Sequence, residues 1–262
     1  MRALKLEIRR AFFNKNMLSS LLMGIVIVFA DLALFSKTFL SQDRVLVQAW
    51  IGTNYLYVYN TIYYTLFSIM ACLPFGGSLY LDITSGYDKN ICIKTSRIDY
   101  ISSKCIAVFL SGTFAVAFPL FMNFFIASGL FPSMQPERLE FTVAGAVLDI
   151  HFLSEVFDYN ASLYCIIYIF IDALFGGAIA LVSLAITKLT GNLFTVIVIP
   201  FVLVLYQTMF MSNDYKNWAV MQMIRPDQQV VTPWLHMLMA YLLILLVSLA
   251  VSIMINRKRD IL

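Results

Sequence analysis

The sequence contains little charge and almost no histidine. Of its 262 residues, 13% are charged and two are histidine, whereas a soluble domain carries about twice that share of charge. The four cysteines form no C-x-x-C pair, and neither H-E-x-x-H nor G-x-S-x-G occurs, so the sequence indicates no disulfide framework, zinc site or hydrolase nucleophile. No glycine begins G-x-x-x-x-G-K-[ST]. We therefore expect no ATP-binding loop, no cofactor and no enzymatic activity in this chain.

Long apolar runs are what the sequence has in abundance. Hydrophobic residues make up 61% of the chain, and a window about as wide as a bilayer finds six stretches long enough to cross about 30 Å of hydrocarbon as helices. These stretches cover residues 17–36, 61–81, 105–129, 163–187, 193–211 and 235–255. We predict an all-α, polytopic membrane protein with six transmembrane helices in a single membrane domain, residues 1–262.

The basic residues between these stretches are distributed unequally. If the amino terminus is cytoplasmic, 13 of the 18 basic residues lie on the inner side. The outer side holds only Lys37, Arg44, Arg138, Lys216 and Arg225. The positive-inside rule then predicts that both termini are cytoplasmic, in a multi-pass protein of the plasma membrane. Because the basic residues follow this topology, the net charge of +3 predicts no nucleic-acid binding.

The segment before the first apolar stretch, residues 1–16, has a helical apolar pattern. Leu4, Ile8, Ala11 and Phe12 fall on one face at helical spacing, with basic residues beside them. A short helix with one apolar and one basic face is typical of a helix that lies in the membrane interface. We predict such an interfacial helix here.

Two outer segments also have a distinct character. Residues 130–162 carry five acidic residues against Arg138 alone, so they form an acidic extracytoplasmic segment. Within it, apolar residues over 143–148 recur at helical spacing and predict a surface helix. Residues 212–233 mix tryptophan and methionine with charged ends. We predict that this segment dips into the outer leaflet as a re-entrant hairpin.

The loop between the second and third stretches, residues 82–104, carries the most specific local signal. Its Ser-Gly pair at Gly86 predicts a turn, and a helix parallel to the inner surface would follow. That helix would present Tyr87, Ile91 and Ile93 to a cytoplasmic partner, since an apolar face on an inner loop needs covering. The alternative is an ordinary solvated loop whose charges only set the topology.

The order of residues in this loop resembles a known family. An acidic residue is followed by Ser-Gly, an apolar helical segment, a Ser-Arg pair and a lysine that opens the next span. In this chain those positions are Asp82, Ser85-Gly86, Ile91 to Ile93, Ser96-Arg97 and Lys104. The pattern resembles permease subunits of type-2 ABC exporters. The chain is also similar to that family in its length, in six spans with both ends inside, and in an amphipathic helix before the first span.

The resemblance implies that the loop is a coupling helix seated on a separate ATP-hydrolysing subunit. It implies two permease subunits, either two copies or a copy and a sister permease, with two ATPase subunits that hold ATP and Mg²⁺. The cargo would be an amphipathic or lipophilic solute in contact with membrane lipid, and we favour peptides. The residues expected to couple are Asp82, Gly86, Tyr87, Ile91, Ile93, Lys94, Arg97 and Lys104.

Three residues inside the apolar stretches are candidates for the substrate path or for gating. Asp172 lies within the fourth stretch, where a carboxylate is costly unless it is paired, hydrated or protonated. Pro74 and Pro200 predict kinks. Two other functions remain open. Asp172 could serve a stand-alone, proton-coupled carrier, or the protein could be a membrane scaffold.

Overall fold

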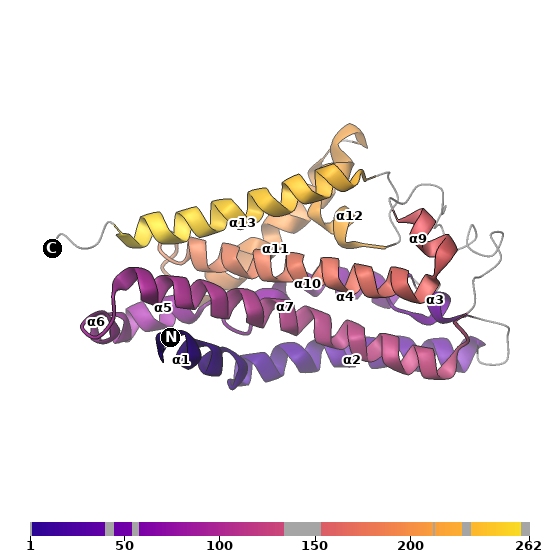
Figure 1. Cartoon of the computed structure of the whole chain (residues 1–262), viewed down its shortest axis with the longest axis horizontal. Coiled ribbons are helices and arrows are strands. Elements are labelled where there is room, and N and C mark those ends of the chain that lie inside the picture. The colour runs from indigo at the N-terminus through magenta and orange to yellow at the C-terminus, as the bar shows by residue number, and fades with distance from the viewer. Residues whose placement is uncertain are drawn as a thin grey trace.

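The computed structural model describes residues 2–39, 45–53, 58–133, 153–211, 213–226 and 232–257. Their regular structure is helical throughout (Figure 1). The elements are α1 (Arg2–Phe12), α2 (Lys15–Phe39), α3 (Leu46–Ala49), α4 (Val58–Cys72), α5 (Ser78–Thr84), α6 (Tyr87–Cys92), α7 (Arg97–Leu130), α9 (Ser154–Tyr159), α10 (Ala161–Ile186), α11 (Leu193–Phe210), the 3₁₀ helix η2 (Asn213–Trp218), α12 (Val220–Ile224) and α13 (Trp234–Arg257).

Five of these helices are long and apolar enough to cross a membrane. They are α2, α7, α10, α11 and α13, and they account for five of the six predicted stretches. The stretch over residues 61–81 is divided between two helices, α4 and α5, so the kink predicted at Pro74 is a complete break in the helix. The chain turns between α4 and α5, where Pro74 and two glycines interrupt the helical pattern, because proline lacks an N–H and glycine disfavours a helix. α4 alone rises about 22 Å, which is less than a bilayer core.

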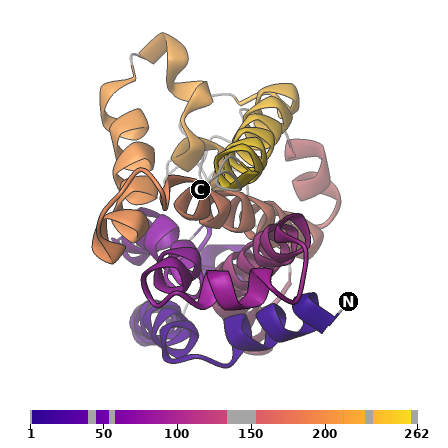
Figure 2. The same cartoon turned by 90° about the vertical axis from the view of Figure 1, so that its left-hand side faces the viewer.

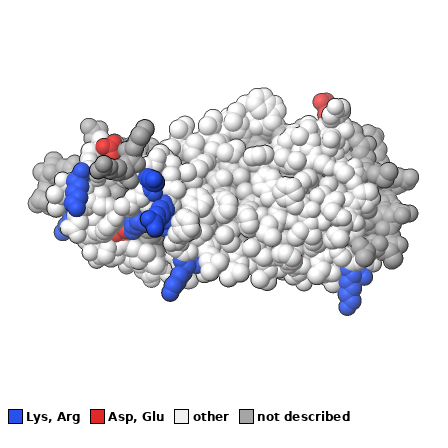
Figure 3. Space-filling model, turned by 60° about the horizontal axis from the view of Figure 1, so that its bottom comes forward, with Lys and Arg blue, Asp and Glu red and all other residues white. Residues whose placement is uncertain are grey.

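The long helices run side by side, and α10 lies in the middle of the bundle (Figure 2). Successive helices alternate in direction, so α2, α7 and α11 begin at the end where α5, α10 and α13 finish (Figure 1). Lys and Arg side chains gather at that same end, next to a broad band with almost no charge (Figure 3). We call it the basic end, and the opposite one the far end.

The predicted amphipathic helix is present as α1, which packs against α7 at the basic end. Ala11 is completely buried, and Ile8 and Phe12 pack on the core there. Phe13, outside this apolar face, is 85% exposed. The apolar face of α1 therefore covers the bundle.

Small residues set the close packing of α7 against α10. A Cβ atom at Gly112 would lie 2.5 Å from the Ala180 Cβ and 3.0 Å from the Gly176 carbonyl oxygen. One of these partners is backbone, which cannot rotate away. The small-residue stripe of α10 therefore lets these two helices approach at a distance that larger side chains forbid.

The far end is filled by two segments that do not cross the bundle. Leu46, Trp50 and Ile51 are fully buried, and the backbone of Ile51 is held by side chains of α7 and α4. Its N–H donates to Asn123 Oδ1 at 2.9 Å, and its carbonyl accepts from Asn60 Nδ2 at 2.7 Å. Nothing in the apolar pattern predicted this plug, residues 45–53.

The second filling segment is α12. Met223 and Ile224 are fully buried, and Tyr164 donates a hydrogen bond to the Pro226 carbonyl at 3.1 Å. Within the predicted re-entrant segment 212–233, α12 thus folds back into the bundle, whereas Tyr215 of η2 is 61% exposed. The surface helix predicted over 143–148 lies outside the described residues.

Candidate functional site

The predicted coupling loop forms a compact helical corner at the basic end. α5 finishes at Thr84, Gly86 adopts a left-handed conformation with φ of 71°, and α6 follows directly. Residues other than glycine rarely adopt this conformation. α7 then begins after Ser96, whose hydroxyl oxygen accepts a hydrogen bond from the Asp99 N–H at 3.1 Å. The corner therefore has defined geometry on both sides of α6.

Only part of the predicted apolar face of this corner is presented to solvent. Ile93 is 82% exposed, and Lys94 beside it is exposed as well. Ile91 is partly buried and packs against the core at the basic end. Tyr87 is half-buried, and the Arg10 guanidinium lies 4.6 Å from the centre of its ring. Of the three predicted residues Tyr87, Ile91 and Ile93, only Ile93 is therefore exposed; Ile98, at the start of α7, is 61% exposed as well.

Asp82, at the root of this corner, lies at the centre of a buried group of charges. Its carboxylate accepts hydrogen bonds from Arg10 Nη2 at 2.6 Å, Lys104 Nζ at 2.5 Å and Tyr100 Oη at 2.5 Å. Glu7 lies 2.8 Å from Arg10 Nη1 and 3.1 Å from Lys104 Nζ. Asp82, Glu7 and Lys104 are at most 2% exposed. We call these five residues the inner ion cluster.

The inner ion cluster ties three helices together. Glu7 and Arg10 come from α1, Asp82 from α5, and Tyr100 and Lys104 from α7. Two carboxylates face two cations, so the four charges balance. Buried charges are tolerated only when they are paired and hydrogen-bonded in this way. The cluster therefore connects α5 directly to both α1 and α7.

The electrostatic environment keeps Asp82 ionised. Burial raises the pKa of this carboxyl, but the hydrogen bond from Arg10 and the charge of Lys104 lower it by more. The net result is a pKa below the ordinary value for aspartate. The Asp82 carboxyl is therefore ionised at neutral pH.

The structure places the predicted coupling residues in two groups. Gly86, Ile93, Lys94 and Arg97 lie on the corner, with Tyr87 and Ile91 linking it to the bundle. Asp82 and Lys104 point inward into the ion cluster, so they do not belong to an exposed surface.

Sequence reasoning missed Glu7, Arg10 and Tyr100 as members of the cluster. The spacing of Glu7 and Arg10, three residues apart, was the one available signal for a local pair.

The three candidates for the path lie at separate places. Pro74 lies in the break between α4 and α5, and Pro200 is buried inside α11. Asp172 is fully buried in α10. Its Oδ2 accepts a hydrogen bond from Tyr64 at 3.0 Å, while its Oδ1 has no hydrogen-bond partner among the described residues.

Among the residues in the described ranges, no three His, Cys, Asp or Glu side chains come together as a possible metal site. Comparisons of the chain with protein-family models, with curated proteins and with solved structures found no match.

Proposed function

We propose that this protein is the membrane subunit of an ATP-driven exporter, with six membrane passages and a cytoplasmic basic end. The sixth passage is the broken pair of α4 and α5, which together return the chain to that end (Figure 1). The observation that carries the proposal is the α5–α6–α7 corner. It presents Ile93 outward on a defined turn and is anchored to the bundle through buried charges.

The corner has the properties that a force-receiving element needs. A separate ATPase subunit would seat Ile93 in an apolar groove. Movement of the corner then reaches α1 and α7 through the inner ion cluster, because Asp82 is bonded to both. It reaches α10 and α11 at the α4–α5 break, where Gly76 and Gly77 leave no room for a Cβ against Ser183 and Leu193. The long helices would repack as rigid rods and move an amphipathic solute, with peptides favoured.

The experiment is affinity purification in mild detergent from native membranes. Ile93→Asp should abolish stoichiometric co-purification of a nucleotide-hydrolysing subunit. Leu189→Asp is the matched control, because Leu189 is 74% exposed in the α10–α11 connection at the same end. We expect it to leave the partner in place. Absence of any such subunit from the wild-type complex would refute the proposal.

A second candidate function is a proton-coupled carrier that uses Asp172. The observation in its favour is the oxygen without a hydrogen-bond partner in the bundle interior, since buried carboxylates are expensive unless they serve a purpose. Purified protein in liposomes should then move solute under a pH gradient alone, and Asp172→Asn should stop it. Transport that requires ATP and a second subunit would exclude this function.

A further inference from the structure

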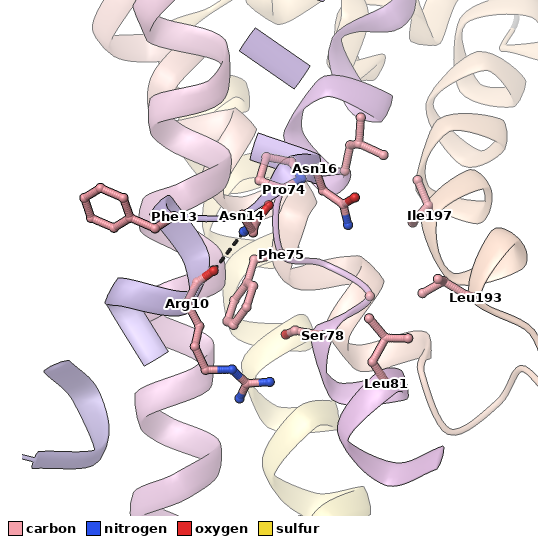
Figure 4. Close-up of a pocket in the computed structure, with 12 residues that line it drawn as sticks. Arg10, Phe13, Asn14, Asn16, Pro74, Phe75, Ser78, Leu81, Leu193 and Ile197 are labelled. Carbon is pink, nitrogen blue, oxygen red and sulfur yellow. Dashed lines mark hydrogen bonds between the residues drawn. The ribbon is translucent and has the colours of Figure 1, made fainter. Parts of the chain in front are cut away.

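A cleft of about 310 Å³ opens beside the inner ion cluster (Figure 4). Three parts of the chain border it: the bend from α1 to α2, the α4–α5 break, and the start of α11. Arg10, on one side of the cleft, belongs to the ion cluster at the basic end, whereas Leu193 and Ile197, on the other, belong to the apolar helix α11. We propose that the cleft binds an anionic phospholipid, with the headgroup against Arg10 and the upper acyl chain along α11. The inference does not depend on an ATPase partner.

The lining of the cleft is divided between polar and apolar groups, as an amphiphile requires. Arg10, Asn16 and Ser78 contribute polar side chains. Leu73, Pro74, Leu193 and Ile197 contribute apolar ones. α11 is the least buried of the long apolar helices, so the apolar side of the cleft is continuous with the surface that faces lipid.

Arg10 retains hydrogen-bonding capacity toward this space. A guanidinium has five N–H donors, and three of them bind Glu7 and Asp82. The two others have no partner among the described residues. The Arg10 side chain is 34% exposed, whereas the side chains of its two carboxylate partners are at most 3% exposed. An incoming phosphate therefore meets the guanidinium edge, and the carboxylates lie behind it.

Charge around the cleft favours an anion over a neutral headgroup. Lys5, Arg9 and Lys15 are all exposed on α1 and at the start of α2. Basic side chains next to a membrane surface attract anionic lipid. α1 also carries the exposed Phe13 into the same region. These features together select an anionic lipid of the leaflet at the basic end.

The test measures lipid retention by native mass spectrometry. The detergent-solubilised wild-type protein is equilibrated with equal amounts of phosphatidylglycerol and phosphatidylcholine that have the same acyl chains. We expect phosphatidylglycerol to be retained about fivefold better. Glycerol phosphate, which lacks acyl chains, should not displace it at equal concentration. Equal retention of the two lipids would overturn the proposal, and displacement by glycerol phosphate would assign the site to a free phosphate instead.

Two variants locate the binding in this cleft. Asn16→Glu places a negative charge in the lining, and Lys37→Gln makes the same change in net charge at the far end of α2, where Lys37 is exposed. We expect phosphatidylglycerol retention to fall about fivefold in the first and less than twofold in the second. Ile197→Trp fills the apolar side without altering charge and should reduce retention as well. Wild-type retention in both Asn16→Glu and Ile197→Trp would show that the lipid binds elsewhere.

Discussion

Replacing Lys104 by methionine tests the inner ion cluster most directly. The ammonium group is fully buried, 2.5 Å from Asp82 and 3.1 Å from Glu7. Methionine matches the lysine side chain up to Cε but lacks the terminal ammonium group, so Arg10 alone remains against two buried carboxylates. Removing one partner of a buried ion pair costs about 3–5 kcal/mol.

We expect this loss as a fall of about 10 °C in the melting temperature of the detergent-solubilised protein, since one kcal/mol corresponds to about 2–4 °C in a chain of this size. Intrinsic fluorescence during heating measures it. Lys94→Met is the matched control, because Lys94 is exposed. Its melting temperature should stay within about 2 °C of wild type.

The double variant Asp82→Asn/Lys104→Met separates charge balance from packing. It leaves Glu7 and Arg10 as one balanced pair, 2.8 Å apart. We therefore expect it to melt above the single variant Lys104→Met. The reasoning fails if Lys104→Met melts like the Lys94→Met control. It also fails if the two losses simply add, because residues in one network should be coupled.

Three further predictions concern pH and glycine. Because the pKa of Asp82 is lowered in the fold, its contribution to stability is full above about pH 4 and is lost as the pH falls through that lowered pKa; acid melting curves of Asp82→Asn should be flatter than those of wild type. Gly112→Ala should lower the melting temperature by several degrees, since its Cβ would meet Ala180 and backbone oxygens. Gly129→Ala, in open space, should match or exceed wild type. At Gly86, with φ of 71° and no atom within 4 Å of an added Cβ, alanine should cost about 1 kcal/mol in thermal melts and asparagine less.

Hydropathy predicted the long helices well because it depends on composition, which spanning helices share. The stretch 163–187 corresponds to α10, Ala161–Ile186. Hydropathy did not register the break after α4, because an average over many residues is insensitive to one proline and two glycines; Pro74 by itself predicted a kink there, but not the full separation of α4 from α5. Hydropathy also could not find the plug at residues 45–53. This segment is too short to span a membrane, and it is buried because neighbouring helices surround it.

Only the part of the candidate site that lies in one continuous loop could be predicted from the sequence. Asp82, Tyr87 and Lys104 were singled out from the order of residues in one loop. Their partners Glu7 and Arg10 lie more than 70 residues away from Asp82 in the sequence. Only the packing of α1 on α7 brings these groups together, and no local pattern encodes that contact.

The plug at residues 45–53 bears on whether a solute could pass through the interior of the bundle. In the described part of the chain, Trp50 and Ile51 fill the interior of the bundle at the far end. The salt-bridged side chains of the inner ion cluster fill it at the basic end. Among the described residues, both extremities of the bundle are therefore filled by side chains. For the proposed exporter this filling favours a solute route along the outside of the bundle, between one copy and a neighbouring subunit, over a route through a single copy.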